Sequence, residues 1–314
     1  MGPQLLGFTK KFWAAFKETF VAWDLRMPFA SSAVIAYYTI FSLPGLLVII
    51  INVAGYFFGK EAVTNQLAGE VQGIVGRDTA TYIQDIIANA SQTQGSVISS
   101  VIGIATLLFG ATGVFYNVQQ IFNKIWEVTP APKARQKFLK LVRDRIFSFG
   151  LIIVVGFLML VSLMISAVLT AVSNWVASHL SESLLIVFNI LDFIFSIGII
   201  TLLFAAMFKY LPDVRLRWKD VWPGALLTTV LFVMAKYLLG LYFGTSEPAS
   251  AYGAAGSVIL IMLWVSYSGL ILLFGAEFTR IWSKKSGHKP KPVDYAKKAG
   301  AEAKTGLGSP EKKS

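Results

Sequence analysis

Two residues of opposite charge, Asp192 and Lys236, stand inside long apolar stretches of the sequence. An ionised side chain at the middle of a membrane helix costs about 2.5–3.5 kcal/mol on insertion scales, so such residues are the best candidates for function. At a rise of 1.5 Å per residue, both lie about 12 Å below the outer membrane surface. A polar site in a translocation cavity and a structural ion pair explain this pattern equally well. Asn189, one helical turn from Asp192, could join the pair.

Further candidates lie near the ends of the first and last apolar stretches. Glu277 comes three residues before Arg280, a spacing that permits an ion pair on one helix. Pro44 interrupts the first stretch and removes an intrahelical hydrogen bond, which predicts a kink there. With Ser42 and Gly45 beside it, this kink could act as a hinge; a static kink is the alternative.

No pattern of catalytic or metal-binding residues accompanies these positions. The chain has no cysteine and only two histidines, His179 and His288, which excludes a disulfide framework, a thiolate zinc site and a histidine-rich metal centre. The sequence contains no H-E-x-x-H, G-x-x-x-x-G-K-[ST] or G-x-S-x-G motif. We therefore expect no enzyme activity, no cofactor and no metal. A hydrolase acting at the membrane interface is the remaining enzymatic alternative.

The elements that hold the candidate residues are predicted to be membrane-spanning helices. Of the 314 residues, 55% are hydrophobic and only 14% are charged, against about 25% charged in an ordinary soluble domain. A helix needs roughly 20 apolar residues to cross a bilayer core. We expect an all-α polytopic membrane protein with six spans, at about 29–58, 97–118, 146–172, 184–208, 221–244 and 252–280. Within the fifth span, Gly240 and Gly244 are spaced for close helix packing.

The distribution of basic residues predicts the orientation. Nearly all of the 28 Lys and Arg residues fall in the N-terminal segment, in the loops 119–145 and 209–220, and from Arg280 onward. With six spans these regions share one side, which the positive-inside rule assigns to the cytoplasm, together with both termini. We expect a bacterial inner-membrane location. The net charge of +11 then attracts anionic lipid at the cytoplasmic face, and we expect no nucleic-acid partner. A homo-oligomer is compatible with this organisation.

Segments outside the spans divide the chain into three parts. Residues 1–28 place four phenylalanines at steps of four, which predicts an amphipathic helix at the cytoplasmic interface, with a partner-binding or core-packing helix as the alternative. The transmembrane domain, 29–282, includes one large outer loop at about 59–96, where apolar residues at helical spacing predict a helical hairpin. Residues 283–314 are rich in Lys, Gly, Ala and Pro, which predicts a basic, disordered cytoplasmic tail.

Four separated blocks of sequence carry a resemblance to a known family. They are SSAVIAYYTIFSL at 31–43, GATGVFYNVQQIFNKIWEV at 110–128, YLPDVRLRWKDVWPGALLTTVLF at 210–232 and YGAAGSVILIMLWVSYSGLILLFGAEFTR at 252–280. In this order they resemble the YihY/BrkB family of bacterial inner-membrane proteins, which implies six spans with cytoplasmic termini. An older label calls some members ribonuclease BN. A nuclease needs clustered carboxylates or histidines, whereas the predicted cytoplasmic segments hold mainly Lys and Arg.

These observations favour a multi-pass membrane protein that moves a lipid or a small organic solute across the cytoplasmic membrane. Because no nucleotide-binding motif is present, such transport would be passive, ion-coupled or powered by a partner. The alternative is a structural or regulatory membrane protein that binds anionic lipid or a partner through its basic cytoplasmic face.

Overall fold

The structure is a computed structural model that describes most of the chain between Pro3 and Lys298, with gaps. The described residues are 3–75, 81, 84–85, 113–130, 150, 183–246, 252, 255–288, 290–293 and 296–298. The third predicted span, most of the second, and the second arm of the predicted outer hairpin therefore lie outside the described residues. The first arm of that hairpin is a helix, α3 (Lys60–Val75).

Long helices dominate the described part of the chain. Two short strands within the chain pair with two short strands that follow the last helix. The elements are α1 (Pro3–Asp24), α2 (Pro28–Phe58), α3, β1 (Val128–Pro130), α7 (Ser183–Tyr210), β2 (Val214–Arg215), α8 (Trp218–Ser246), α9 (Gly256–Lys285), β3 (Lys291–Pro292) and β4 (Ala296–Lys298). Residues 113–125 are also helical.

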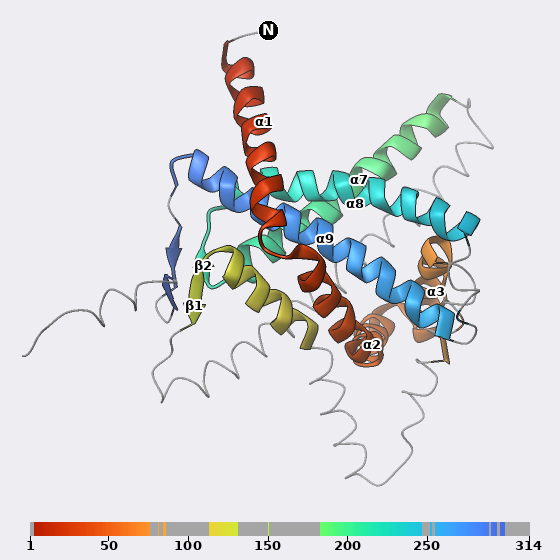
Figure 1. The fold of residues 1–314 in the computed structure, drawn as a ribbon. Coiled ribbons are helices and arrows are strands. Elements are labelled where there is room, and N and C mark those ends of the chain that lie inside the picture. Colours follow the sequence, from red (N-terminus) through yellow and green to blue (C-terminus); the bar gives the residue numbers. More distant parts are fainter. Residues whose placement is uncertain are drawn as a thin grey trace, which may run out of the picture.

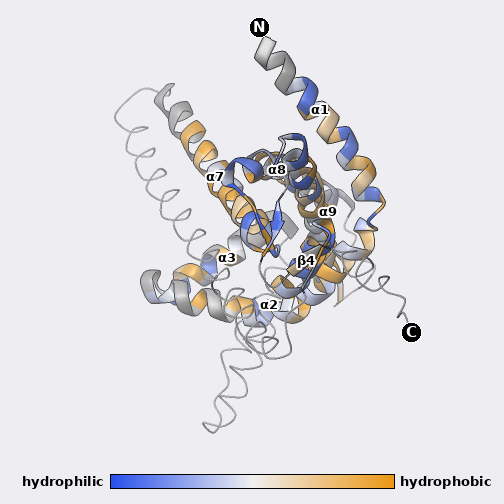
Figure 2. Ribbon diagram, turned by 90° about the vertical axis from the view of Figure 1, so that its left-hand side faces the viewer, coloured by the Kyte–Doolittle hydropathy of each residue, from blue (hydrophilic) through white to orange (hydrophobic). Residues whose placement is uncertain are grey.

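Four of the described helices are long and apolar enough to cross a membrane. The stretches are Pro28–Leu47 in α2, Phe193–Tyr210 in α7, Trp218–Phe243 in α8 and Gly256–Lys285 in α9. They correspond to the first, fourth, fifth and sixth predicted spans. Large hydrophobic side chains are exposed along α7 and α8, and Figure 2 shows the hydrophobic colour running along α7. Such surfaces suit lipid as the surrounding solvent. The count of six spans and the side of the termini stay predictions.

Helix α9 lies at the centre of the described helices. Helices α1, α2 and α8 each pack against α9, and α7 packs against α8 (Figure 1). The largest buried apolar cluster joins the helix 113–125, the end of α7, the start of α8 and the second half of α9. This cluster includes the fully buried or nearly buried rings of Phe122 and Phe208, whose centroids are 5.8 Å apart. The largest buried cluster of the described residues therefore lies at the end of the bundle where α7 ends and α8 begins.

Helices α8 and α9 approach closely because each places a threonine against a glycine of the other. A Cβ atom on Gly275 would overlap Oγ1 of Thr228. A Cβ atom on Gly224 would overlap Oγ1 of Thr279. Both hydroxyls donate to carbonyl oxygens one turn back on their own helices, so the crossing buries no unsatisfied hydroxyl. Among the described residues nothing lies within 4 Å of a Cβ atom on Gly240, and close helix packing at this position stays a prediction.

Helix α1 packs Phe12 and Phe16 on the second half of α9. The ring centroids of Phe12 and Phe278 are 5.2 Å apart, and those of Phe16 and Phe274 are 5.4 Å apart. This contact is the core-packing alternative for the N-terminal helix. Another face of α1 is open, since Trp13 is 57% exposed. An interfacial position for that open face stays a prediction.

Helix α2 runs without interruption through the candidate hinge. Pro44 lies inside the helix, and the flanking Ser42 and Gly45 are both buried. A helix interior tolerates proline when its neighbours hold the backbone in place. The predicted hinge motion stays a prediction.

The predicted disorder of residues 283–314 is wrong for the first part of this tail. Helix α9 continues to Lys285, β3 pairs with β2, and β4 pairs with β1, both antiparallel. Between the two strands, the amide of Val293 donates to the carbonyl oxygen of Asp213 at 3.1 Å. The prediction of disorder was based on the side-chain composition of the tail. The order arises from main-chain hydrogen bonds to the open edges of β1 and β2, and a Lys-rich segment can form such bonds as well as any other. The described part of the chain is thus mostly helical, with two small sheets.

Candidate functional site

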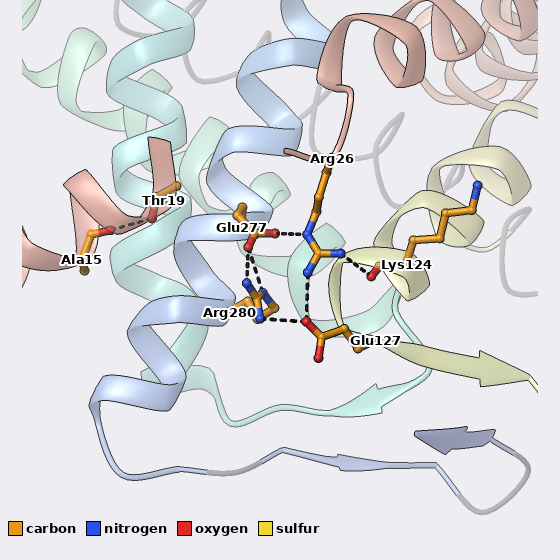
Figure 3. A network of polar contacts seen from close by, with 7 residues as sticks. All are labelled: Ala15, Thr19, Arg26, Lys124, Glu127, Glu277 and Arg280. Atoms are coloured by element: carbon orange, nitrogen blue, oxygen red, sulfur yellow. Dashed lines mark hydrogen bonds and ion pairs between the residues drawn. The ribbon is translucent and has the colours of Figure 1, made fainter. Parts of the chain in front are cut away.

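A buried carboxylate, Glu277, forms the centre of a charge network on α9. Its side chain is fully buried, and the Nε atom of Arg280 donates to its Oε1 atom at 2.9 Å, while Nη2 of the same guanidinium also contacts Oε1. On the other side, Nε of Arg26 lies 3.1 Å from Oε2 (Figure 3). The ion pair permitted by the spacing of Glu277 and Arg280 is therefore present, and a second arginine joins it.

A second carboxylate, Glu127, closes the network. Nη2 of Arg26 donates to its Oε1 atom at 3.0 Å, and Nη1 of Arg280 donates to the same oxygen at 3.2 Å. Arg26 also donates from Nη1 to the carbonyl oxygen of Lys124 at 2.9 Å (Figure 3). Two guanidinium groups and two carboxylates therefore alternate in space. They join the link between α1 and α2, the end of the helix 113–125, and α9.

The electrostatic environment of Glu127 favours its charged form. Partial burial by itself raises the pKa of this carboxyl group, but Lys284 and Arg280, followed by Arg26, lower it by a larger total amount. The pKa of Glu127 therefore lies below its usual value of 4.5. The Glu127 carboxylate is therefore charged at neutral pH.

The backbone is unusual on both sides of this network. Among the described residues other than glycine, Met27 and Glu127 have positive φ angles, of 53° and 55°. This left-handed conformation costs roughly 1–2 kcal/mol for an L-residue, and it persists where the surrounding contacts enforce it. Met27 directly follows Arg26, and Glu127 is itself paired with Arg26. Both left-handed residues therefore lie at the ion pairs of the network.

A second buried carboxylate, Asp213, lies near the network and is bound by amides. Nδ2 of Asn123 donates to Oδ2 of Asp213 at 3.0 Å, and the Asp213 amide donates back to Oδ1 of Asn123 at 2.8 Å. Gln119 contributes a longer hydrogen bond of 3.4 Å. These contacts tie the helix 113–125 to the segment between α7 and α8.

The sequence-based candidate Lys236 lies on the inward stripe of α8. Thr229, Phe232 and Lys236 follow one another at helical steps, and the Phe232 ring packs 5.7 Å from that of Phe204 on α7 and 5.8 Å from that of Trp264 on α9. Lys236 itself is partly buried. By helical spacing, Lys236 therefore shares the face of α8 on which Phe232 contacts α7 and α9.

The predicted partners of Lys236, Asp192 and Asn189, lie in α7, and their side chains are outside the described part of the structure. Depth can still be compared, because Oγ1 of Thr201 donates to Oγ1 of Thr229 at 3.0 Å and fixes the level of α7 against α8. Counting nine residues from each threonine places position 192 level with position 238. That is about 3 Å from the level of Lys236. The predicted equal depth is consistent with this register, and the ion pair stays a prediction.

No group of three or more His, Asp or Glu side chains that could hold a metal ion occurs among the described residues.

The charge network itself was only partly predictable. Glu277 and Arg280 were found from their spacing on one helix, whereas Arg26 and Glu127 were missed. Their contacts join positions about a hundred or more residues apart, and no local spacing signals such a contact.

The apolar spans and the charges buried between them define a multi-pass helical membrane protein. The chain belongs to the family described as Virulence factor BrkB, whose profile matches residues 21–299. The family resemblance noted in the sequence is thereby confirmed.

Relatives of this chain are named mainly as membrane proteins. A UPF0761 membrane protein of Tolumonas auensis is 31% identical over 199 residues, which cover 62% of this chain and 59% of the relative. One of Alteromonas mediterranea is 26% identical over 281 residues, covering 84% and 87%. A protein of Bacillus subtilis named as ribonuclease-like, YfkH, is 22% identical over 272 residues, covering 86% and 95%. The chain spans about half the length of several other curated relatives. No solved structure matches it.

Proposed function

We propose that this membrane protein moves a lipid or a small organic solute across the bacterial cytoplasmic membrane. Lys236 is the observation that carries the proposal. It lies within the candidate span Trp218–Phe243, on the stripe of α8 that faces α7 and α9. Because a charge in a span is costly, its position on an inward stripe supports a role in a polar path for a headgroup or solute.

An apolar groove beside this residue favours a lipid over a small solute. The groove lies between α1, α8 and α9, has a volume of about 430 Å³, and its lining surface is apolar. It is lined by Phe16, Phe20 and Trp23 of α1 and by residues of the two spans, including Ala235, which directly precedes Lys236. This volume falls in the range of about 300–1,000 Å³ that is common for ligand pockets. An apolar groove of this volume suits an acyl chain.

We do not extend the ribonuclease-like name of the Bacillus subtilis relative to this chain. The buried carboxylates in the described residues are engaged by other side chains: Glu277 binds arginines, Asp213 binds amides, and Asp220 binds Arg217. None of them stands in a cluster that could hold a catalytic metal. We therefore propose that the protein is not an enzyme.

The alternative function, binding of anionic lipid or of a partner by the basic face, is favoured by one group of contacts. Lys11 lies 5.0 Å from the ring centroid of Trp282 and donates to Ser286, and Lys285 pairs with Glu18 at 2.8 Å. These contacts fix cations where α1 meets the end of α9. In this case the protein would bind lipid without moving it.

Reconstitution in liposomes separates the two functions. We expect the wild-type protein to move fluorescent phospholipid between the leaflets, Lys236→Met to abolish this movement, and Lys236→Arg to retain it. Lys219→Met is the matched control, because Lys219 is an exposed cation at the start of the same helix. Movement by Lys236→Met at the wild-type rate, or no movement by the wild type above empty vesicles, would refute the transport proposal.

A charge-swapped pair tests the role of the partner position. If Asp192→Lys combined with Lys236→Asp restores stability that both single variants lose, but not lipid movement, the pair is structural and functional. If it restores both, the pair only locks the two helices.

A further inference from the structure

A second groove lies between α7 and α8, and Phe12 of α1 also lines it. Its volume is about 720 Å³, and its lining surface is almost entirely apolar. Side chains of Ile194, Ile197, Leu226 and Val230 form its walls. The one hydroxyl in the wall, that of Thr201, is already engaged by the Ile197 carbonyl and by Thr229. The groove therefore presents a large apolar surface to a ligand, and the Thr201 hydroxyl in its wall already has hydrogen-bond partners.

Aromatic residues mark the end of this groove near the start of α8. Trp222 lines the groove, and Trp218 comes one helical turn earlier on the same face of α8. The ring centroids of these tryptophans are 6.4 Å apart, and the Tyr210 ring lies 5.9 Å from that of Trp218. All three side chains are partly exposed. Tryptophan and tyrosine gather at the level of the lipid headgroups, so this end of the groove is its headgroup end.

A cation, Lys209, is held against the rings at the aromatic end. Its Nζ atom lies 5.3 Å from the ring centroid of Trp218 and 5.6 Å from that of Tyr210, and it donates to the carbonyl oxygen of Leu216 at 2.6 Å. An ammonium group has three N–H donors, and the Leu216 carbonyl takes one of them. The two rings and this hydrogen bond hold the ammonium in place, so an anion that binds it meets a positioned charge.

The nearby acidic residue does not compensate this cation. Asp220, in the first turn of α8, accepts hydrogen bonds from Nε and Nη2 of Arg217 at 3.0 and 3.2 Å. These two contacts are bidentate, the strongest geometry for a carboxylate and a guanidinium. Among the described residues Lys209 forms no ion pair with a carboxylate, so its charge can meet a ligand.

We propose that the α7/α8 groove binds an anionic phospholipid, with one acyl chain along the apolar walls and the phosphate against Lys209. The apolar length and the cation at one end match the two parts of such a lipid. This inference deepens the proposed handling of lipid, and it rests on that function only for its biological use. Binding is measured at equilibrium and movement between leaflets is measured separately, so either can fail alone.

Because the chain contains no cysteine, one introduced cysteine can carry a fluorophore without background. We would label Leu226→Cys in the groove and, as a reporter control, Met234→Cys, which is exposed on α8 and does not line the groove. The protein is reconstituted with brominated phosphatidylglycerol or brominated phosphatidylcholine as quencher. We expect half-maximal quenching at position 226 with about fivefold less phosphatidylglycerol than phosphatidylcholine, the factor that one basic residue near the surface provides. At position 234 the two lipids should quench alike.

Variants of the cation complete the test. Lys209→Gln should remove the preference at position 226, Lys209→Arg should keep it, and Lys219→Gln should leave it unchanged. Equal quenching by the two lipids in the parent protein would overturn the proposal without any variant. A preference that survives Lys209→Gln would overturn it as well. Quenching at position 234 but not at position 226 would show that another part of the chain fills the groove, and would also overturn it.

Discussion

Replacing Glu277 by glutamine should destabilise the protein strongly, because this change removes the central charge of the network without changing the size of the side chain. Breaking a buried ion pair typically costs about 3–5 kcal/mol. Glu277 is fully buried, and Arg280 is 9% exposed, so the site qualifies as buried. Glu127 would still neutralise part of the remaining charge. We therefore expect a cost near the lower end of that range, about 3 kcal/mol.

The matched variant is Glu127→Gln, which changes the other carboxylate of the same network. The Glu127 side chain is 56% exposed, and exposed ion pairs contribute only about 0–1 kcal/mol. Thermal unfolding of the purified protein in detergent, followed by tryptophan fluorescence, measures both. At roughly 2–4 °C per kcal/mol, Glu277→Gln should lower the Tm by roughly 6–12 °C, and Glu127→Gln by a few degrees at most. Equal shifts for the two variants, or no shift for Glu277→Gln, would refute the assignment of the network as a buried structural centre.

Two further predictions concern the helix crossing and the exposed carboxylate. Gly275→Ala should lower the free energy of unfolding by about 1–3 kcal/mol through overpacking, because its new methyl group overlaps Thr228. Gly240→Ala should be neutral or stabilising, because no described atom lies within 4 Å of the new methyl group. Melting curves of the two variants compare them directly. Since the folded state lowers the pKa of Glu127 below 4.5, its contribution to stability is present above that pH and is lost as the pH falls through the lowered pKa. The stability difference between wild type and Glu127→Gln should therefore persist at pH 6 and vanish in strong acid; a difference that grows on acidification contradicts this sign.

Spans and short-range pairs could be predicted from the sequence because their signals are local. The helices α2, α7, α8 and α9 fall on predicted apolar stretches, and their lengths follow from the thickness of the bilayer. The contact of Glu277 with Arg280 follows from three residues of helical spacing. Both signals are contained in fewer than about 30 neighbouring residues, the length of one span.

The rest of the site depends on contacts between distant segments. Arg26 reaches Glu127 and Glu277 from the link between two helices, and the pattern of that link shows only a basic residue before an apolar run. Likewise, Gly224 and Gly275 are two of several glycines in the spans, and only the packing of α8 against α9 makes these two tight. The pairing of the tail was missed for the same reason, since a two- or three-residue strand has no periodicity to detect.

The pairing of β3 with β2 and of β4 with β1 has a consequence for biogenesis. Both tail strands follow α9, so during translation they leave the ribosome only after every described span has been synthesised. Until the tail strands have been synthesised, the backbone groups of β1 and β2 that pair with them have no strand partner. Pairing of the two small sheets is thus a late step of folding. A chain that ends just beyond Lys285 would contain the described helices but neither β3 nor β4, so β1 and β2 would stay without these partners.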